Sequence, residues 1–198
     1  RRTGPPSVSE MIDDKKDGDN GFEAFWTNID FRMRFNDLVY IHFYNDGVMT
    51  DENVIAAWDN LNNYIYGPII CESARWGDER SSNPMDRDNE WDAARVAVRN
   101  DLRGRANNFI SKLQSSGYFS TLPAPKYFSA NDEIDTSVLQ TAANITLTIS
   151  REGEYGAVYY TTDGSDPRTW DLNASVSANA ILASGITISK ATIVKART

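Results

Sequence analysis

Two prolines in the segment STLPAPKYF, Pro123 and Pro125, divide the sequence into a part that can form helices and a part that cannot. Proline lacks the N–H that a helix interior needs, and it disfavours helical geometry in the residue before it. Before these prolines, apolar residues recur every three or four positions, and after them apolar and polar residues alternate. The first spacing is typical of helices and the second of strands. The sequence therefore predicts a helical domain followed by a strand domain.

Three apolar stripes at helical spacing are expected to face a core. Their members are Phe31, Phe35, Leu38 and His42 or Phe43; Val54, Trp58, Leu61 and Ile65; and Trp91, Ala94, Val98, Leu102, Phe109 and Leu113. Thr50 is a suitable N-cap for the second helix, and Gly67 with Pro68 interrupts that helix. Gly104 is expected to break the third stretch, and Gly117 to end it.

The strand region contains the runs ITLTIS, AVYYTT and GITISKATIVKART. Alternation places Ile145, Leu147 and Ile149 on an inner face, with Val194 and Ala196 as a second inward pair. Val158 and Tyr160 alternate with Tyr159 and Thr161, which predicts that Tyr159 points outward. Asp163 and Gly164 form a strong hairpin-turn signal, because glycine accepts positive φ and aspartate bonds its own backbone.

These patterns predict a multidomain α plus β fold. Residues 1–25 mix Pro, Gly and charge without periodicity and are expected to be irregular. Residues 26–122 are expected to form a bundle-like helical region. Residues 123–198 are expected to form a β-sandwich of the immunoglobulin or fibronectin type III kind, because short strands alternate there with turn signals.

Charge and hydropathy exclude several partners. Lys and Arg number 20 against 28 Asp and Glu, so the net charge is −8 and the long-range field repels nucleic acid. No apolar run approaches the roughly 18 residues of a membrane span. The chain begins RRTGPP, with neither an initiator Met nor an apolar signal segment, which predicts a fragment of a larger protein.

No catalytic device or metal site is expected from these residues. His42 is the single histidine and falls in an apolar stripe, so we expect it in the core rather than in catalysis. Cys71 is the single cysteine and follows two isoleucines, a setting typical of an unreactive thiol. GxxxxGK[ST], GxGxxG and HExxH are all missing. The segment MIDDKKDGDNGFE fails as a calcium loop, because Lys15 and Ala24 occupy positions that need oxygen ligands.

The densest group of charged and aromatic side chains lies in CESARWGDERSSNPMDRDNEW, residues 71–91. Glu72 and Arg75 are spaced to pair on a helix that ends near Gly77, and one interpretation is a structural latch. The other interpretation is a ligand or partner surface, because guanidinium groups clamp anions and stack on planar groups. Its members would be Arg75, Trp76, Asp78 and Arg80.

Three segments resemble the C-terminal helical part of the CotH family, named for spore coat protein H. They are FRMRFNDLVYIHFYNDGVMTDENVIAAWDNLNNYI, ESARWGD and EWDAARVAVRNDLRGRANNFISKLQSSGYF. In that family an FR-x-x-F helix, an ESARWGD-like turn and an Arg-containing helix ending in G-x-Y follow one another in this order. The resemblance covers residues 26–128. This sequence has Leu102 to Arg105 where the family has an aromatic-Pro step, and Gly117 to Phe119 approximates G-x-Y.

CotH proteins are kinase-like phosphotransferases, so the resemblance implies ATP, a divalent metal and a protein substrate for the parent protein. The family's nucleotide and metal residues belong to the portion that would precede Arg1. The resemblance therefore gives this chain no catalytic residue and no cofactor of its own. It implies an upstream kinase-like domain as a partner, and a bacterial protein that is extracellular or on the cell surface.

The strand region has a resemblance of its own. VYYTTDGSDPR followed by ATIVKART is similar to the small β-sandwich modules that resemble the chitobiase C-terminal domain. Such modules are often appended to secreted bacterial glycosidases and to CotH-like proteins. In this resemblance the DGSDP stretch marks a hairpin rather than a catalytic group.

Three functions follow as hypotheses. The first is a non-catalytic accessory region, in which a helical lobe supports a kinase-like domain and the β-sandwich is a spacer or interaction module. The second is a carbohydrate-binding module that uses Tyr159, Trp170 or Trp76, because aromatic faces stack on sugars. The third is a remnant of a phosphotransferase site, in which Arg75 or Arg80 reaches a phosphate of ATP. A surface protein is a further possible partner.

Overall fold

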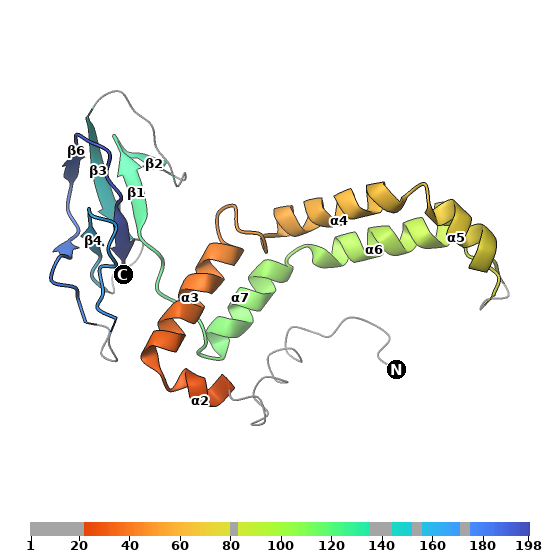
Figure 1. Ribbon diagram of the computed structural model, residues 1–198, viewed down its shortest axis with the longest axis horizontal. Helices are drawn as coiled ribbons and strands as arrows, with labels where there is room; N and C mark the ends of the chain where they lie inside the picture. The colour runs from red at the N-terminus through yellow and green to blue at the C-terminus, as the bar shows by residue number, and fades with distance from the viewer. Residues whose placement is uncertain (1–21, 80–82, 135–143, 152–155, 171–174) are drawn as a thin grey trace. The chain divides into compact units, whose positions relative to one another are not determined.

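The computed structural model describes residues 22–79, 83–134, 144–151, 156–170 and 175–198, which form helices and antiparallel strands in a mixed α and β fold (Figure 1). They divide into two compact units. The helical unit comprises residues 37–116, and the β unit comprises residues 22–36 and 117–198. The boundary between the two units falls within one helix, α3 (Ile29–Phe43).

The helical unit contains the second part of α3 and four further α-helices, with a π-helical turn before α6. Their bounds are α4 (Asp51–Ile65), α5 (Ile69–Trp76), η2 (Arg87–Trp91), α6 (Asp92–Leu102) and α7 (Arg105–Ser115). The Thr50 hydroxyl accepts a hydrogen bond from the Asn53 N–H at 3.4 Å, which confirms the expected N-cap of α4. Gly104 has φ of 75° and separates α6 from α7, as predicted.

The apolar core of the helical unit is small. Val39, Ile110 and Leu113 are buried, and the rings of Phe43 and Phe109 stack with their centroids 5.0 Å apart. These contacts come from α3 and α7. None of the helices among the described residues is both long and apolar enough to cross a membrane.

Two of the expected stripes are rotated by one position. Leu61 is 55% exposed while the next residue, Asn62, is 4% exposed. Likewise Leu38 is exposed and Val39 is buried. A stripe of three- and four-residue spacings fixes the period of a helix but not which of two adjacent positions faces the partner. The prediction of Leu38 and Leu61 as core residues was therefore wrong.

The β unit begins with a short helix, α2 (Phe22–Trp26), where irregular chain was predicted up to residue 25. Its strands are β1 (Lys126–Ser129), β2 (Asp132–Ile134), β3 (Ile145–Ser150), β4 (Tyr159–Thr161), β5 (Ile181–Leu182), β6 (Ile186–Ile188) and β7 (Lys195–Arg197). They form two antiparallel sheets, in the orders β2-β1-β3-β6 and β5-β4-β7.

Both sheets contribute to one core. Leu147 and Ile149 come from β3, while Val158 and Tyr160 come from β4 and the residue before it, and all four are buried together. Ile186, Ile188, Val194 and Ala196 are among the apolar residues that pack against this cluster. The inward positions predicted for β3 and for the last strand are confirmed, because alternation with a period of two holds in both.

One prediction in the β unit, the hairpin turn after β4, was wrong. Thr161, at the end of β4, is 1% exposed, and its hydroxyl donates a 2.6 Å hydrogen bond to the Ser165 carbonyl. Asp163 and Gly164 do not form a hairpin turn, since β4 pairs with β5 and β7. The Asp163 carboxylate instead accepts bonds from the backbone and hydroxyl of Ser165, and the Gly164 N–H donates to the Ile193 carbonyl at 3.1 Å.

The segment before residue 37 packs within the β unit through aromatic rings and one amide. The Trp26 ring makes edge contacts with Phe35 and Tyr118, at centroid distances of 5.5 and 4.8 Å. The Asn36 side chain donates to the Tyr118 carbonyl at 3.2 Å and accepts from the Ser120 N–H at 2.8 Å. Residues 22–36 are therefore part of the β unit, although most of them are helical.

Candidate functional site

Trp170 is an exposed aromatic residue of the β unit, with 60% of its surface accessible. The guanidinium carbon of Arg168 lies 4.4 Å from the centroid of the Trp170 ring. A cation in this position attracts the ring face electrostatically and fixes its orientation. The sequence predicted Trp170 as a sugar-stacking residue, and the structure shows it as an exposed ring that another side chain supports.

Arg168 itself is 5% exposed. Its Nη1 donates to the Asp30 carboxylate on α3 at 2.9 Å and to the Thr169 carbonyl at 3.2 Å. Its Nε and Nη2 are buried and have no hydrogen-bond partner among the described residues. Burying unpaired N–H groups is costly, so Asp30 is the contact that makes this position tolerable.

The backbone of Arg168 is held by the turn before it. The Asp166 carboxylate accepts a bond from the Arg168 N–H at 3.0 Å, and Arg197 on β7 donates two bonds to it at 2.7 and 2.8 Å. Burial alone would raise the pKa of Asp166, but the bonds from Arg197 and from the Arg168 N–H outweigh burial and lower that pKa. Asp166 is thus a carboxylate that stays ionised and joins β7 to the turn carrying Trp170.

Tyr159, the other predicted sugar-binding residue, lies on β4 between Leu182 of β5 and Arg197 of β7. It is half-buried, unlike the neighbouring core residue Tyr160. No contact among the described residues joins the Tyr159 ring to Trp170. The structure therefore does not bring these two predicted residues into one aromatic platform.

The predicted cluster near ESARWGD lies at the end of α5. Arg75 and Trp76 are both exposed, and the Arg75 guanidinium carbon lies 4.9 Å from the Trp76 ring centroid. The expected Glu72 to Arg75 ion pair is not formed, because Arg75 contacts the adjacent ring instead. Asp78 is exposed in the turn after the helix, and Arg80 lies outside the described residues.

α5 ends at Gly77, as the sequence predicted. A residue with a side chain would not fit at this position. A Cβ on Gly77 would lie 2.4 Å from the Met85 carbonyl oxygen and 2.5 Å from that of Ser73. The Gly77 carbonyl in turn accepts a bond from the Met85 N–H at 2.8 Å. This close turn returns the chain to η2, so the structure supports a structural role for the segment around residue 77.

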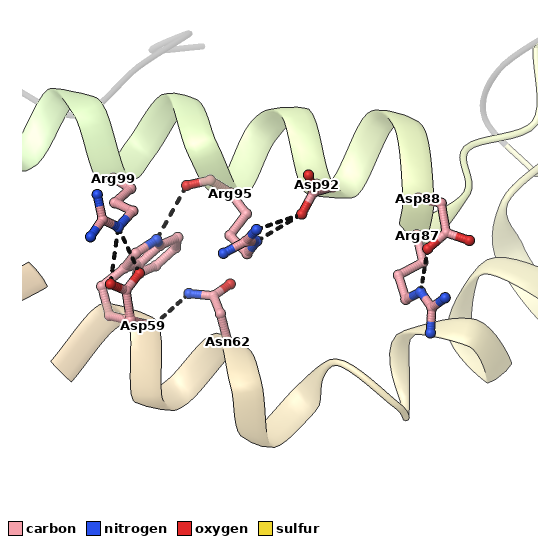
Figure 2. Close-up of polar contacts among 8 residues, drawn as sticks. Asp59, Asn62, Arg87, Asp88, Asp92, Arg95 and Arg99 are labelled. Carbon is pink, nitrogen blue, oxygen red and sulfur yellow. Dashed lines mark hydrogen bonds and ion pairs between the residues drawn. The ribbon is translucent and has the colours of Figure 1, made fainter. Parts of the chain in front are cut away.

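Polar contacts join α4 and α6, as Figure 2 shows. Arg99 on α6 donates to both oxygens of Asp59 on α4 at 2.9 Å, and the indole of Trp58 donates to the Arg95 carbonyl at 3.2 Å. Asn62 donates to the Trp58 carbonyl at 2.6 Å within the same interface. These bonds fix how the two helices are rotated against each other.

That rotation leaves one side of the α4–α6 layer apolar and exposed. A helix turns once in about 3.6 residues, so residues 54, 57, 61 and 64 share a side of α4, and residues 94 and 98 lie on the same side of antiparallel α6. We call this surface the apolar face; its members are Val54, Ala57, Leu61, Tyr64, Ala94 and Val98. Tyr64 is 83% exposed, and Leu61 and Val98 are also exposed. The opposite side is hollowed, and its lining mixes charged and apolar residues: Asp51, Glu52, Ile55, Ala56, Asp59, Arg99 and Arg103.

Sequence reasoning missed this surface because it assigned four of its members to a core: Val54, Leu61, Ala94 and Val98. The other candidates for catalysis or metal binding are His42, Cys71 and the acidic side chains. His42 is half-buried on α3, and Cys71 is exposed on α5 rather than in the apolar setting predicted for it. Within the described residues, no group of three or more His, Cys, Asp and Glu side chains is arranged to hold a metal ion.

Comparison with known families gives one match. The family model described as Fn3 associated matches residues 145–198. This range begins at β3 and includes the core and the Trp170 turn, so it fits a fibronectin III-like β module at this end of the chain. Among curated proteins and among solved structures, no significant match to the chain was found. The CotH resemblance of residues 26–128 stays a prediction.

Proposed function

We propose that this chain is a non-catalytic accessory region of a larger, secreted or surface-located bacterial protein of the CotH type. In this proposal the helical unit supports a kinase-like domain of the same protein, and the β unit is an immunoglobulin- or fibronectin III-like spacer or interaction module. The observation that carries it is the apolar face, where Leu61, Tyr64 and Val98 are exposed together. An exposed apolar surface of this kind is typical of a protein contact.

Further support comes from how the α4–α6 layer is built. Its interhelical contacts include an ion pair and a hydrogen bond, while Leu61, Tyr64 and Val98 are exposed. A layer with this arrangement gains its apolar burial only when another surface covers it. ATP and a divalent metal, which the CotH resemblance implies, would belong to the kinase-like domain.

The test compares the natural full-length protein with the 198-residue chain. We expect the melting temperature of the helical unit to be higher in the full-length protein by about 5 °C or more, since roughly 1 kcal/mol shifts a domain of this size by that amount. Tyr64→Ser and Leu61→Ser should reduce this gain in the full-length protein. Asn63→Ser, which lies on the opposite side of α4, is the matched control and should not.

Two results would overturn the proposal. One is a natural protein that contains no kinase-like domain. The other is a melting temperature of the helical unit that is the same in both proteins.

A second candidate function is carbohydrate recognition at Trp170. The observation that favours it is the exposed ring whose face is supported by Arg168 at 4.4 Å. A glycan array with the whole chain tests it, with Trp170→Ala expected to lose binding and Trp76→Ala expected to retain it. Equal binding by both variants would place any sugar site elsewhere.

A further inference from the structure

A hollow of about 540 Å³ lies on the β unit, at the end of β1 and the start of β3. This volume falls within the range of about 300–1,000 Å³ that is common for small-molecule sites. Its lining is Ser129, Ala130, Asn131, Asn144, Ile145, Thr146 and Thr148. None of the described lining residues carries a charge, and five of the seven have a neutral hydroxyl or amide.

The polar side chains of this hollow are available to a ligand. Thr146 and Thr148 point away from the core, since they alternate with buried Leu147 and Ile149 on β3. Asn131 and Asn144 are also exposed. Within the part of the chain that the structure describes, these four side chains make no hydrogen bond to another residue.

The turn between β1 and β2 determines where Asn131 stands. Ser129 pairs with Asp132, so two residues form the turn, and both have positive φ, 50° for Ala130 and 75° for Asn131. A two-residue turn with this geometry matches the twist of its strands and connects them without further loop residues. Asn131 is therefore held at the rim of the hollow rather than on a loose loop.

An aromatic ring borders the hollow on the same side of the sheet. Tyr127 packs against the core, so its neighbour Phe128 faces outward, paired with Thr148 on one side and Glu133 on the other. Beyond it the Lys126 ammonium and the Glu133 carboxylate lie 3.2 Å apart and neutralise each other. The surface next to the hollow therefore presents a ring and a neutralised ion pair, and the exposed Asp132 carboxylate follows the turn.

We infer that this hollow binds a neutral oligosaccharide. Hydroxyl and amide groups both donate and accept, which matches the hydroxyl groups of a sugar. The ring of Phe128 offers an apolar surface to the C–H face of an adjoining sugar unit. An anionic ligand would find no cation among the described lining residues, and a lipid would meet their polar side chains. The site involves neither the apolar face nor Trp170, so it is independent of both functions proposed above.

The test is a titration of the isotope-labelled 198-residue chain, followed by amide chemical shifts. The probes are the neutral tetrasaccharides cellotetraose, xylotetraose, mannotetraose and tetra-N-acetylchitotetraose, with tetragalacturonate as the anionic control. We expect at least one neutral probe to shift the amides of residues 129–131 and 144–148 at millimolar concentration. Tetragalacturonate should leave them unchanged.

Variants then separate this site from the rest of the sheet. Thr148→Val should weaken binding by about three- to ten-fold, which corresponds to the loss of one hydrogen bond. Thr187→Val is the matched control, because Thr187 is exposed on the same side of the neighbouring strand β6 but does not line the hollow. Both variants keep a β-branched side chain and should fold.

Three results would overturn the inference. The first is the absence of shifts in residues 129–131 and 144–148 with every neutral probe. The second is shifts confined to the surroundings of Trp170, which would instead support the second candidate function. The third is an equal loss of affinity in the Thr148 and Thr187 variants.

Discussion

The β unit and the α4–α6 layer of the helical unit bury different kinds of side chain. In the β unit, Leu147, Ile149, Val158 and Tyr160 from two sheets are buried together. At the α4–α6 interface of the helical unit, the most buried residue is Asn62, and an ion pair joins Asp59 to Arg99. Apolar burial supplies most of the free energy of folding, whereas partly exposed ion pairs supply little. The β unit therefore gains more free energy from its own buried core than the α4–α6 layer gains from these polar contacts.

The largest effect is expected from breaking the core of the β unit. Tyr160→Ala should lower the free energy of unfolding of that unit by about 3–5 kcal/mol, because it leaves a large cavity between two sheets. Leu61→Ala in the helical unit is the matched control and should change its stability by less than about 0.5 kcal/mol. Denaturant unfolding followed by resolved amide signals of each unit measures both. Similar losses of stability in the two variants would contradict the contrast between the β unit and the α4–α6 layer.

The next effect concerns the charge that holds the Trp170 turn. Arg197→Gln should destabilise the β unit by about 1–3 kcal/mol, because it removes two donors from the largely buried carboxylate of Asp166. The pKa of Asp166 is lower in the folded state than the ordinary value of 3.8. Its contribution is therefore fully present above that value and is lost as the pH falls through the lower, folded pKa.

Thermal unfolding of the two proteins between neutral and acid pH measures this dependence. The loss of stability below the ordinary pKa of Asp166 should be smaller in Arg197→Gln than in the unchanged protein. An identical acid profile in both proteins would show that the Asp166 to Arg197 pair does not stabilise the β unit.

A smaller loss of stability is expected from removing a carboxylate of α4 that accepts hydrogen bonds from the start of another helix. Asp51, at the first position of α4, accepts hydrogen bonds from the Gly104 and Ala106 N–H groups at the start of α7. Asp51→Ala should cost about 1–2 kcal/mol, the usual value of a lost helix cap. Hydrogen exchange of the first turn of α7 should quicken. Unchanged exchange would mean that backbone geometry at Gly104 suffices to start that helix.

The smallest effect is expected on the apolar face. Tyr64→Ser in the 198-residue chain should change the free energy of unfolding by no more than about 0.5 kcal/mol, because the side chain is already exposed. Thermal unfolding checks this value. A loss above about 1 kcal/mol would show that Tyr64 packs within the chain, and the apolar face would then lose its role as a contact surface.

Local signals explain which parts of the fold could be predicted. Thr50, Gly104 and Gly77 act on their own neighbours, so the helix boundaries that depend on them followed from the sequence. The inner face of β3 followed from alternation for the same reason. The conformation at Asp163–Gly164 did not follow from the sequence. The predicted hairpin is not formed, because β4 pairs with strands far along the chain rather than with the residues after the turn.

The candidate site depends on contacts that are distant in sequence. The sequence alone identified Trp170 as an aromatic residue in a polar loop. It could not identify the contact of Arg168 with that ring, since Arg168 bonds to Asp30, 138 residues away. The apolar face was hidden by a rotation of one position at Leu61 and Asn62, which the spacing alone does not determine. The hollow beside Thr148 needed the register of β1 against β3 as well as the two-residue turn.

The exposed thiol of Cys71 has a practical consequence. It is the single cysteine of the chain and lies on α5. A maleimide dye would therefore attach at one known position of the helical unit and leave the β unit unlabelled. Fluorescence from that dye would follow the helical unit alone, without any engineered residue.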